Sequence, residues 1–282
     1  MQIIETIKQM SHWSEAERRD GRRIALVPTM GFLHDGHLSL VRSTQQRADR
    51  IVVSIFVNPA QFSTNEDFPA YPRDFERDRR LLEKENIHAL FNPSVAEMYP
   101  EGYETHVNVD KLALPLCGAH RPGHFRGVAT VVAKLFNIVR PHLAIFGEKD
   151  YQQLQLIRRL VLDLNFDIEI VSHPIVREAD GLAVSSRNVY LGPQERQAAL
   201  CLFRSLRLAA CMVERGETRS EVITKAVRAR IKEEPLAQVE YVTLCNFATL
   251  KPVEEIRGSV LLALAVRIGK TRLIDNQILK QE

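Results

Sequence analysis

Short apolar runs alternate with segments of helical periodicity through the first 175 residues, and this alternation restricts the fold more than any other feature of the chain. The runs are rich in Val and Ile, as in strands that are covered on both faces of a parallel sheet. The pattern therefore predicts an α/β domain over residues 1–175. We expect its strands at Ile24–Val27, Ile51–Val57, Ala89–Phe91, Ala144–Phe146 and Ile168–Val171, and its helices at Leu38–Arg47, Phe75–Lys84, Val128–Val139 and Gln152–Leu164.

Near residue 175 the pattern changes. A hairpin or linker is expected from Ile175 to Asn188, with its turn at residues 178–181. Helices followed by adjacent strands indicate a smaller α+β domain over residues 176–282, which would serve as a lid. We expect its helices at about Pro193–Arg215 and Ser220–Lys232, and its strands at Val239–Leu244, Ser259–Ile268 and Arg272–Ile274.

The segment from Met30 to His37 follows the first expected strand, after the breaker Pro28, and leads into a helical pattern. Two histidines, His34 and His37, are three residues apart with Gly36 between them. The amino terminus of a helix attracts anions through its free amides and its dipole. This junction is therefore a candidate site for a triphosphate, although an ordinary turn with two exposed histidines would have the same pattern.

Polar residues also follow two other expected strands. Asn58 and Gln61 flank a proline-stiffened turn, and their amides suit a small substrate with hydroxyl and carboxylate groups. The segment Gly147–Asp150 precedes a helix that contains Gln153, and Lys149 within it is placed to neutralise phosphate charge. Ligands bind beyond the carboxyl ends of parallel strands, so we expect these loops to line one cleft. Each motif alone would also fit a plain turn or a helix capped by Asp150.

Two further segments are candidates. Val184–Asn188, at the expected domain junction, contains two serines and Arg187, which can bind phosphate oxygens in bidentate fashion, although a polar linker has the same composition. Residues His120–Gly127 place two histidines and two arginines around a Pro-Gly pair. We expect that loop to shape the rim of the active site, because the residues near it lack the spacing of a metal site.

Composition excludes several classes of protein. The net charge is +3 in 282 residues with scattered basic side chains, too mild a bias for a nucleic-acid surface. The longest apolar run, Val260–Val266, is far shorter than the roughly 20 residues that span a bilayer, and residues 1–10 do not resemble a signal peptide. The four cysteines show no paired spacing, which indicates a reducing cytoplasm.

Together these motifs resemble the pantothenate synthetase family, the AMP-forming pantoate–β-alanine ligases. The resemblance covers nearly the whole chain and rests on five segments in the family's order: Pro28–His37, Phe56–Phe62, Arg121–Phe125, Gly147–Gln153 and Ser185–Asn188. It implies a fold with a Rossmann-like parallel sheet, helices on both of its faces, and a smaller α+β C-terminal lid domain. Ala60 and Val184 depart from the family's usual residues, but both are apolar, so they affect pocket shape rather than chemistry.

The resemblance also implies the site. It assigns catalytic roles to His37, His34, Lys149 and Arg187. Pantoate would bind at Gln61 and Gln153 with Asn58 close by, and β-alanine would bind near Gln61. The implied ATP site comprises Met30, Gly31, Phe32, Leu33, His34, Asp35, Gly36, His37, Gly147, Glu148, Lys149, Asp150, Val176, Val184, Ser185, Ser186 and Arg187.

The implied reaction joins (R)-pantoate to β-alanine through a pantoyl adenylate, with ATP and Mg²⁺ as cofactors. Mg²⁺ would be held mainly by ATP and water, with Asp150 as an indirect contributor. The implied enzyme is a cytoplasmic homodimer with small-molecule substrates and no nucleic-acid or membrane partner. Three alternatives stay open at this stage: a nucleotidyltransferase of the same superfamily that acts on a phosphorylated acceptor, a tRNA-charging enzyme, and a nucleotide sensor without turnover.

Overall fold

The computed structural model describes residues 1–63 and 66–281, and the chain divides into two compact units. The large unit comprises Met1–Ala113, Arg121–Glu148 and Gln153–Pro174. The small unit comprises Leu114–His120, Lys149–Gln152 and Ile175–Glu282. Two short segments from the first 175 residues thus belong to the small unit.

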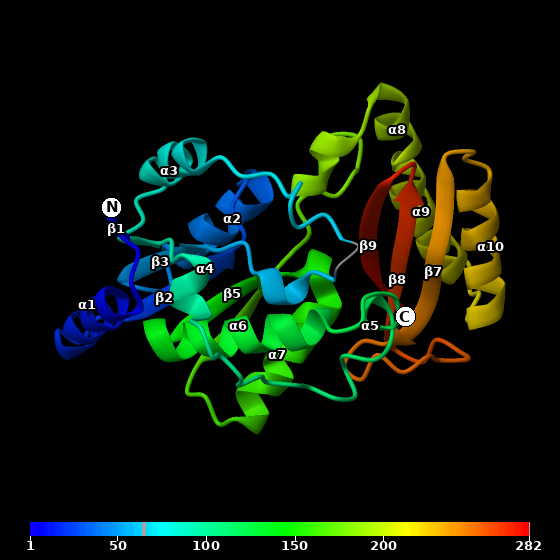
Figure 1. Cartoon of the computed structure of the whole chain (residues 1–282). Helices are drawn as coiled ribbons and strands as arrows, with labels where there is room; N and C mark the ends of the chain where they lie inside the picture. The colour runs from blue at the N-terminus through cyan, green and yellow to red at the C-terminus, as the bar shows by residue number, and fades with distance from the viewer. Residues whose placement is uncertain (64–65, 282) are drawn as a thin grey trace. The chain divides into compact units, whose positions relative to one another are not determined.

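The large unit is an α/β domain, as the sequence predicts (Figure 1). Within the described ranges its sheet has six strands, parallel in each pair, in the order β1-β4-β3-β2-β5-β6. The strands are β1 (Gln2–Ile4), β2 (Ile24–Thr29), β3 (Arg50–Ile55), β4 (Ala89–Phe91), β5 (Leu143–Gly147) and β6 (Glu169–His173). Its helical elements are α1 (Ile7–Arg19), α2 (Asp35–Thr44), η1 (Pro59–Gln61), α3 (Phe75–Glu83), α4 (Val95–Met98) and α6 (His124–Val139). Between β5 and β6 run the short turn η2 (Glu148–Asp150) and α7 (Tyr151–Asp163), whose first residues belong to the small unit.

Helices lie on both faces of this sheet because its strands are apolar on both sides. Alternate residues of β3 such as Ile51 and Val53 pack with Leu38 of α2 and Leu82 of α3 on one face. On the other side of the sheet, α1 and α6 contact each other. There the Ser11 hydroxyl donates to the carbonyl oxygen of Ile138 at 3.3 Å. This arrangement confirms the predicted fold class.

Pro28 does not break the first predicted strand, contrary to its interpretation as a breaker. β2 continues through it to Thr29, and Pro28 stays in register with Ser54 of β3. The Thr29 carbonyl accepts from Phe56 N–H at 3.1 Å. Because the backbone groups of successive strand residues point to opposite sides, the backbone nitrogen of Pro28 faces away from β3. Pairing with β5 ends at Leu26, and the missing N–H of proline therefore costs no ladder hydrogen bond.

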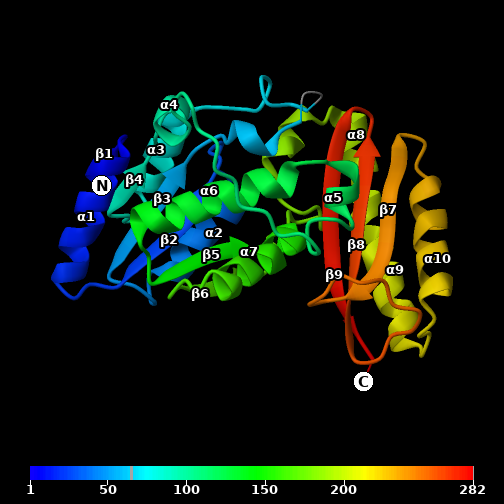
Figure 2. The ribbon, with the colours of Figure 1, turned by 60° about the horizontal axis from the view of Figure 1, so that its bottom comes forward.

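The small unit contains, within the described residues, an antiparallel sheet of three strands in the order β7-β8-β9. Figure 2 shows α9 and α10 along one face of this sheet. The side chains of that face form one apolar core with these helices, for example Ile223, Val242, Leu264 and Leu273. The elements of the unit are α5 (Cys117–His120), η3 (Ser186–Tyr190), α8 (Pro193–Ala198), α9 (Leu200–Glu214), α10 (Ser220–Lys232), β7 (Ala237–Asn246), β8 (Ser259–Ile268) and β9 (Thr271–Lys280).

The direction of the connections changes between β2 and β5. From β2 the chain proceeds to β3 and β4 on one side, whereas β5 and β6 lie on the other side of β2. Open α/β sheets bind ligands at such a switch point, beyond the carboxyl ends of the strands. The loops that begin there are the candidate segments after Thr29 and after Gly147.

Candidate active site

The loop after β2 turns sharply before α2 begins. Gly31 and Phe32 both have positive φ values, of 79° and 49°. A Cβ atom on Gly31 would meet Ile55 Cγ2 at 3.0 Å, so both its backbone angle and its surroundings favour glycine. The Thr29 hydroxyl accepts from Gly31 N–H at 3.1 Å and donates to the Ser54 carbonyl at 2.8 Å. The turn is therefore held by its own strand and by β3.

Asp78, on α3, fixes the same loop from outside. Its carboxylate accepts from Phe32 N–H at 2.6 Å and from Leu33 N–H at 2.8 Å, and the residue is only 1% exposed. Burial raises the pKa of Asp78 above its usual value, although the two amide bonds oppose that shift. The sequence interpretation missed Asp78. The available signal was an acidic residue one turn before the buried Leu82, on the inner face of a helix.

The two histidines lie side by side at the amino terminus of α2. His34 is the N-cap residue, and its ring stacks on that of His37 with centroids 4.0 Å apart and planes inclined by 26°. The backbone N–H of His34 donates to Nδ1 of His37 at 3.4 Å. A neutral His37 ring with Nδ1 as acceptor carries its proton on Nε2. That N–H, together with the first amides of α2, suits an anionic ligand.

Asn58 and Gln61 form an ordered pair of buried amides on the turn η1. Asn58 Nδ2 donates to Gln61 Oε1 and to the Gly127 carbonyl, both at 3.1 Å. Asn58 Oδ1 accepts from Ala60 N–H at 3.2 Å and from the Tyr99 hydroxyl at 2.8 Å. Burial raises the pKa of Tyr99, which therefore stays protonated and able to donate. Both hydrogens and both lone pairs of the Asn58 amide are thus used within the protein.

The helix α6 packs against η1, the turn that contains Gln61. A Cβ atom on Gly127 would lie 2.1 Å from the Ala60 carbonyl oxygen, so only glycine permits this approach. His124 Nδ1 lies 2.8 Å from the Gln61 carbonyl oxygen. Arg121 Nη2 donates to the same oxygen at 3.4 Å, and Arg121 also pairs with Glu66 at 2.5 Å. The segment expected at the rim of the site therefore supports the Gln61 turn.

Other predicted site residues lie in the small unit. Lys149 and Asp150 form an ion pair at 3.6 Å within η2, and Asp150 directly precedes α7. Val176 and Val184 pair through their backbones, with Val184 N–H donating to the Val176 carbonyl at 3.0 Å. At the start of η3, Ser185 Oγ accepts from the backbone N–H of Arg187 at 3.3 Å. The expected hairpin thus brings Val176 next to the segment Val184–Arg187.

The candidates consequently fall into two sets. The small unit holds Lys149, Asp150, Val176, Val184, Ser185, Ser186 and Arg187. The large unit holds Met30–His37, Asn58, Gln61, Gly147, Glu148 and Gln153, the last of these half-buried on α7. Among the described residues no group of three His, Cys, Asp or Glu side chains has the geometry to hold a metal ion by itself.

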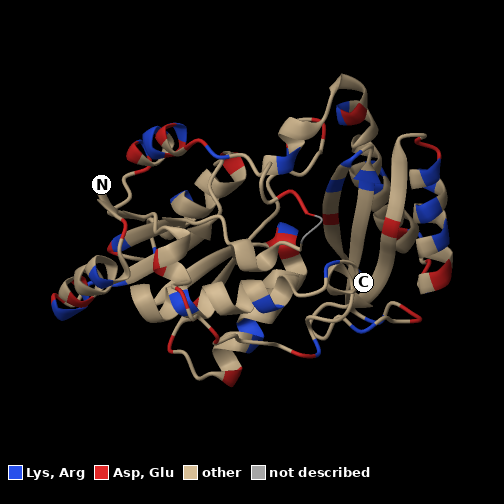
Figure 3. Cartoon of the chain, in the orientation of Figure 1, with Lys and Arg blue, Asp and Glu red and all other residues tan. Residues whose placement is uncertain are grey.

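Charges of both signs are interspersed along the surface helices. Figure 3 shows Lys or Arg beside Asp or Glu on α1, α3 and α10. Several form ion pairs one turn apart, such as Arg19 with Glu15 and Arg79 with Glu76. In the part of the chain that the structure describes, no helix is both long and apolar enough to cross a bilayer.

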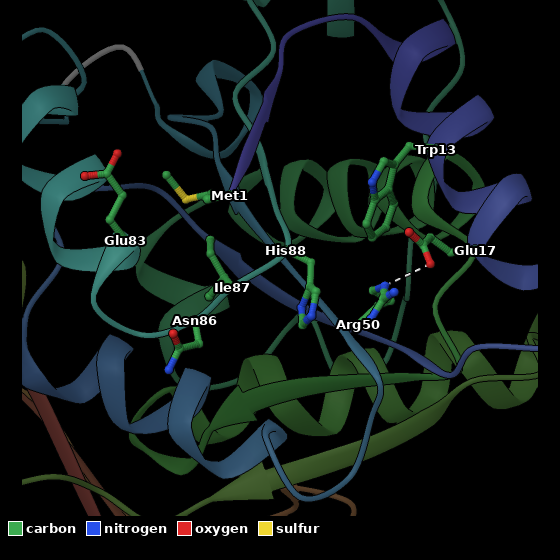
Figure 4. A pocket seen from close by; sticks show the side chains of 8 residues that line it. All are labelled: Met1, Trp13, Glu17, Arg50, Glu83, Asn86, Ile87 and His88. Carbon is green, nitrogen blue, oxygen red and sulfur yellow. Dashed lines mark hydrogen bonds and ion pairs between the residues drawn. The ribbon is translucent and has the colours of Figure 1, made fainter. Parts of the chain in front are cut away.

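A cavity of about 530 Å³ lies in the large unit, but at the amino ends of β3 and β4 (Figure 4). Trp13, Arg50 and His88 are among its lining residues. Arg50 donates to Glu17 at 2.8 Å, and His88 Nδ1 accepts from a strand N–H at 3.1 Å, so these groups are engaged in holding the fold. This cavity is at the edge of the sheet opposite to the candidate loops, and we do not assign it to the active site.

Comparison with known proteins finds one family along nearly the whole chain. A family profile described as pantoate–β-alanine ligase matches residues 2–278. The pantothenate synthetases of Heliobacterium modesticaldum and Geobacter sulfurreducens are each 56% identical to the chain, over 99% and 100% of its length and all of theirs. The structure of the Thermus thermophilus pantothenate synthetase matches with a TM-score of 0.93 at 44% identity, covering 98% of this chain and 99% of that one. The Francisella tularensis pantoate–β-alanine ligase, in complex with a form of ATP and β-alanine, matches with a TM-score of 0.82 at 34% identity over 99% and 97% of the chains.

Proposed function

Because the chain belongs to the pantoate–β-alanine ligase family, it is a ligase that forms pantothenate in an ATP-dependent reaction, and we propose that this reaction passes through a pantoyl adenylate of (R)-pantoate. A carboxylate oxygen of pantoate attacks the α-phosphorus of ATP, and the bond to pyrophosphate breaks. The β-alanine amine then attacks the activated carbonyl carbon, and its C–O bond to AMP breaks. The amine loses a proton as the amide forms.

The main support for this proposal is the loop between β2 and α2, which contains His34. An ionised carboxylate needs no general base to attack phosphorus, so the first step depends on stabilising charge that moves onto the phosphates. His37 supplies the Nε2–H described above, and His34 stacks beside it at the helix terminus. We propose that Lys149 and Arg187 also stabilise charge on the phosphates. ATP would contact the segments Met30–His37, Gly147–Asp150 and Val184–Arg187 together with Val176.

The buried amides suit the other substrate. We propose that Gln61 and Gln153 bind the hydroxyl and carboxylate oxygens of pantoate, and that β-alanine approaches near Gln61. Asn58 already makes four hydrogen bonds within the protein, so its part is to orient the Gln61 amide rather than to touch pantoate. This distinction refines the role expected for Asn58 from the sequence.

Magnesium would bind at this site together with the nucleotide. The described residues offer no cluster of ligands that could hold it alone, whereas ATP supplies the phosphate oxygens that Mg²⁺ prefers. When bound, it would neutralise phosphate charge. Asp150 is half-exposed beside Lys149 and could hold a water of the metal shell. We also propose that the enzyme is a cytoplasmic homodimer, whose partners are pantoate, β-alanine and ATP rather than nucleic acid or membrane.

Transfer of a heavy oxygen isotope tests the proposal. Pantoate labelled with oxygen-18 in its carboxylate should leave one labelled oxygen in AMP, because the C–O bond breaks in the second step. AMP release should require pantoate, and hydroxylamine in place of β-alanine should trap a hydroxamate. AMP without the label would exclude the adenylate, whereas nucleotide binding without any release would indicate a sensor.

A further inference from the structure

The three-stranded sheet of the small unit has a second face that does not belong to its helical core. Strand side chains alternate between the two faces of a sheet. Leu273 and Leu279 of β9 pack into the core with the helices, so Arg272 and Asn276 point to the opposite face. Tyr241 of β7 lies on that face too, since its neighbour Val242 is in the core. These polar side chains have other partners.

The first partner is the segment Leu114–His120. Tyr241 Oη lies 3.2 Å from Cys117 Sγ, and Arg272 donates to the same sulfur at 3.5 Å. Gln152 then binds this segment from the other side. Its Oε1 accepts from Cys117 N–H at 3.0 Å, and its Nε2 donates to the Pro115 carbonyl at 2.7 Å. The start of α7 is thereby connected to the sheet through buried hydrogen bonds.

The second partner is the segment Lys149–Gln152, whose lysine we assign to the ATP phosphates. Asn276 Nδ2 donates to the backbone carbonyl of Lys149 at 2.9 Å, and Asn276 is only 7% exposed. Its own backbone is fixed as well, because Asp275 Oδ1 accepts from Asn276 N–H at 2.8 Å. Asp275 in turn forms a two-point ion pair with Arg177, at 2.7 and 2.9 Å. The donor that holds Lys149 is therefore mounted on a rigid strand.

We infer that Asn276 is a positioning residue for Lys149, because its side chain fixes the backbone of the lysine on strand β9 of the small unit's sheet. This inference rests on the proposed role of Lys149 at the ATP phosphates. Lys149 is only one residue beyond Glu148, which belongs to the large unit, yet its carbonyl and the nearby Gln152 are both tied to the small unit. Loss of the Asn276 donor would release this backbone carbonyl and widen the range of positions open to the ammonium group.

A double-mutant cycle tests this coupling. Single-turnover adenylation, followed by hydroxylamine trapping at saturating ATP and pantoate, would be measured for Asn276→Ala, Lys149→Ala and the double variant. We expect Asn276→Ala to slow adenylation about tenfold, the effect of losing one hydrogen bond from the reactive arrangement. In the Lys149→Ala background the same substitution should change the rate less than about twofold. The KM for pantoate should stay unchanged throughout.

Two further variants separate positioning from folding. Asn276→Asp keeps the volume of the side chain but cannot donate to the Lys149 carbonyl when ionised, so it should be slow as well. Asn246→Ala is the matched control, because Asn246 caps a turn of the same unit by accepting from Ala248 N–H at 3.0 Å and from Thr249 N–H at 2.9 Å. It should lower the melting temperature and leave adenylation within about twofold, since its bonds do not reach Lys149.

The outcomes are distinct. Equal effects of Asn276→Ala in both backgrounds, or wild-type adenylation in Asn276→Ala and Asn276→Asp, would overturn the inference while Lys149 kept its role. Wild-type adenylation in Lys149→Ala would instead remove the lysine from the proposed function, and the inference with it.

Discussion

Gly127 gives the sharpest test of how the turn η1, which contains Gln61, is held in place. A Cβ atom at this position of α6 would lie 2.1 Å from the Ala60 carbonyl oxygen, 2.3 Å from its carbon and 2.6 Å from Gln61 N. Ordinary carbon–oxygen contacts are about 3.3 Å or longer, so either η1 or α6 must move by roughly 1 Å in Gly127→Ala. Such overpacking typically costs about 1–3 kcal/mol of unfolding free energy.

The functional consequence should exceed the loss of stability. Movement of η1 displaces Gln61 and weakens the bond from Asn58 to the Gly127 carbonyl. A misplacement of about 1 Å can reduce a rate about 10²-fold, so we expect pantoate-dependent adenylation to fall by that order. ATP affinity, measured by calorimetry, should stay near wild type, because Thr29 and Asp78 hold the loop before α2 and its bond from Gln61 to the Met30 sulfur is weak.

The control for Gly127→Ala is Gly192→Ala. A Cβ atom there meets only Glu195 Oε2, at 3.7 Å, and the residue has an ordinary φ of −65°. Its substitution should leave adenylation unchanged. The reasoning would be refuted if Gly127→Ala retained the wild-type urea midpoint and the wild-type adenylation rate. A lower midpoint with an unchanged adenylation rate would show that α6 moves and that η1 does not depend on it.

Three other predictions concern single side chains, two of the proposed site and one of the fold. Gln153→Ala should weaken pantoate binding by about 1–3 kcal/mol with ATP affinity preserved; loss of ATP affinity alone, by calorimetry, would contradict the assignment of Gln153 to pantoate. Arg187→Lys keeps the charge but not the planar fork, so AMP released per pantothenate at limiting β-alanine should rise; an unchanged ratio with normal adenylation would make Arg187 a passive linker. His142 Nδ1 accepts from Ile24 N–H at 2.9 Å, and burial together with nearby arginines lowers its pKa below 6.5. As the pH falls, the unfolded chain therefore takes up a proton at His142 at a higher pH than the folded protein does. The free energy of unfolding should be constant above about pH 6.5 with respect to this group and should decrease as the pH falls below that value. Urea unfolding of His142→Asn should show a smaller decrease.

The sequence predicted the parts of the fold in which apolar periodicity is strong. The five strands expected within residues 1–175 are present, and the fold class is confirmed. The first strand and helix were missed for a physical reason: β1 has three residues with only Ile4 buried, and α1 buries only Met10 and Ser14. Neither leaves a clear pattern. The long helix expected from residue 193 is interrupted at Ala199, where α8 ends and α9 begins.

The division of the motifs between the two units was beyond sequence reasoning. The expected boundary near residue 175 follows the change of pattern, but Lys149 joins the small unit through Asn276, a residue 127 positions further on. Likewise Asp78 supports the histidine loop from a helix that follows a different strand. Local propensity contains no information on such partners, because each bond depends on which surfaces tertiary packing brings together.

The orientation of the Gln61 amide determines what this neutral side chain can offer to a ligand. Asn58 donates to Gln61 Oε1, so Gln61 must present its Nε2 hydrogens as donors. In this structure Nε2 donates to the thioether sulfur of Met30 at 2.8 Å. A thioether is a weak acceptor, whereas a carboxylate or hydroxyl oxygen is a strong one. At the proposed pantoate site, a substrate oxygen would therefore gain this N–H in exchange for a weak partner.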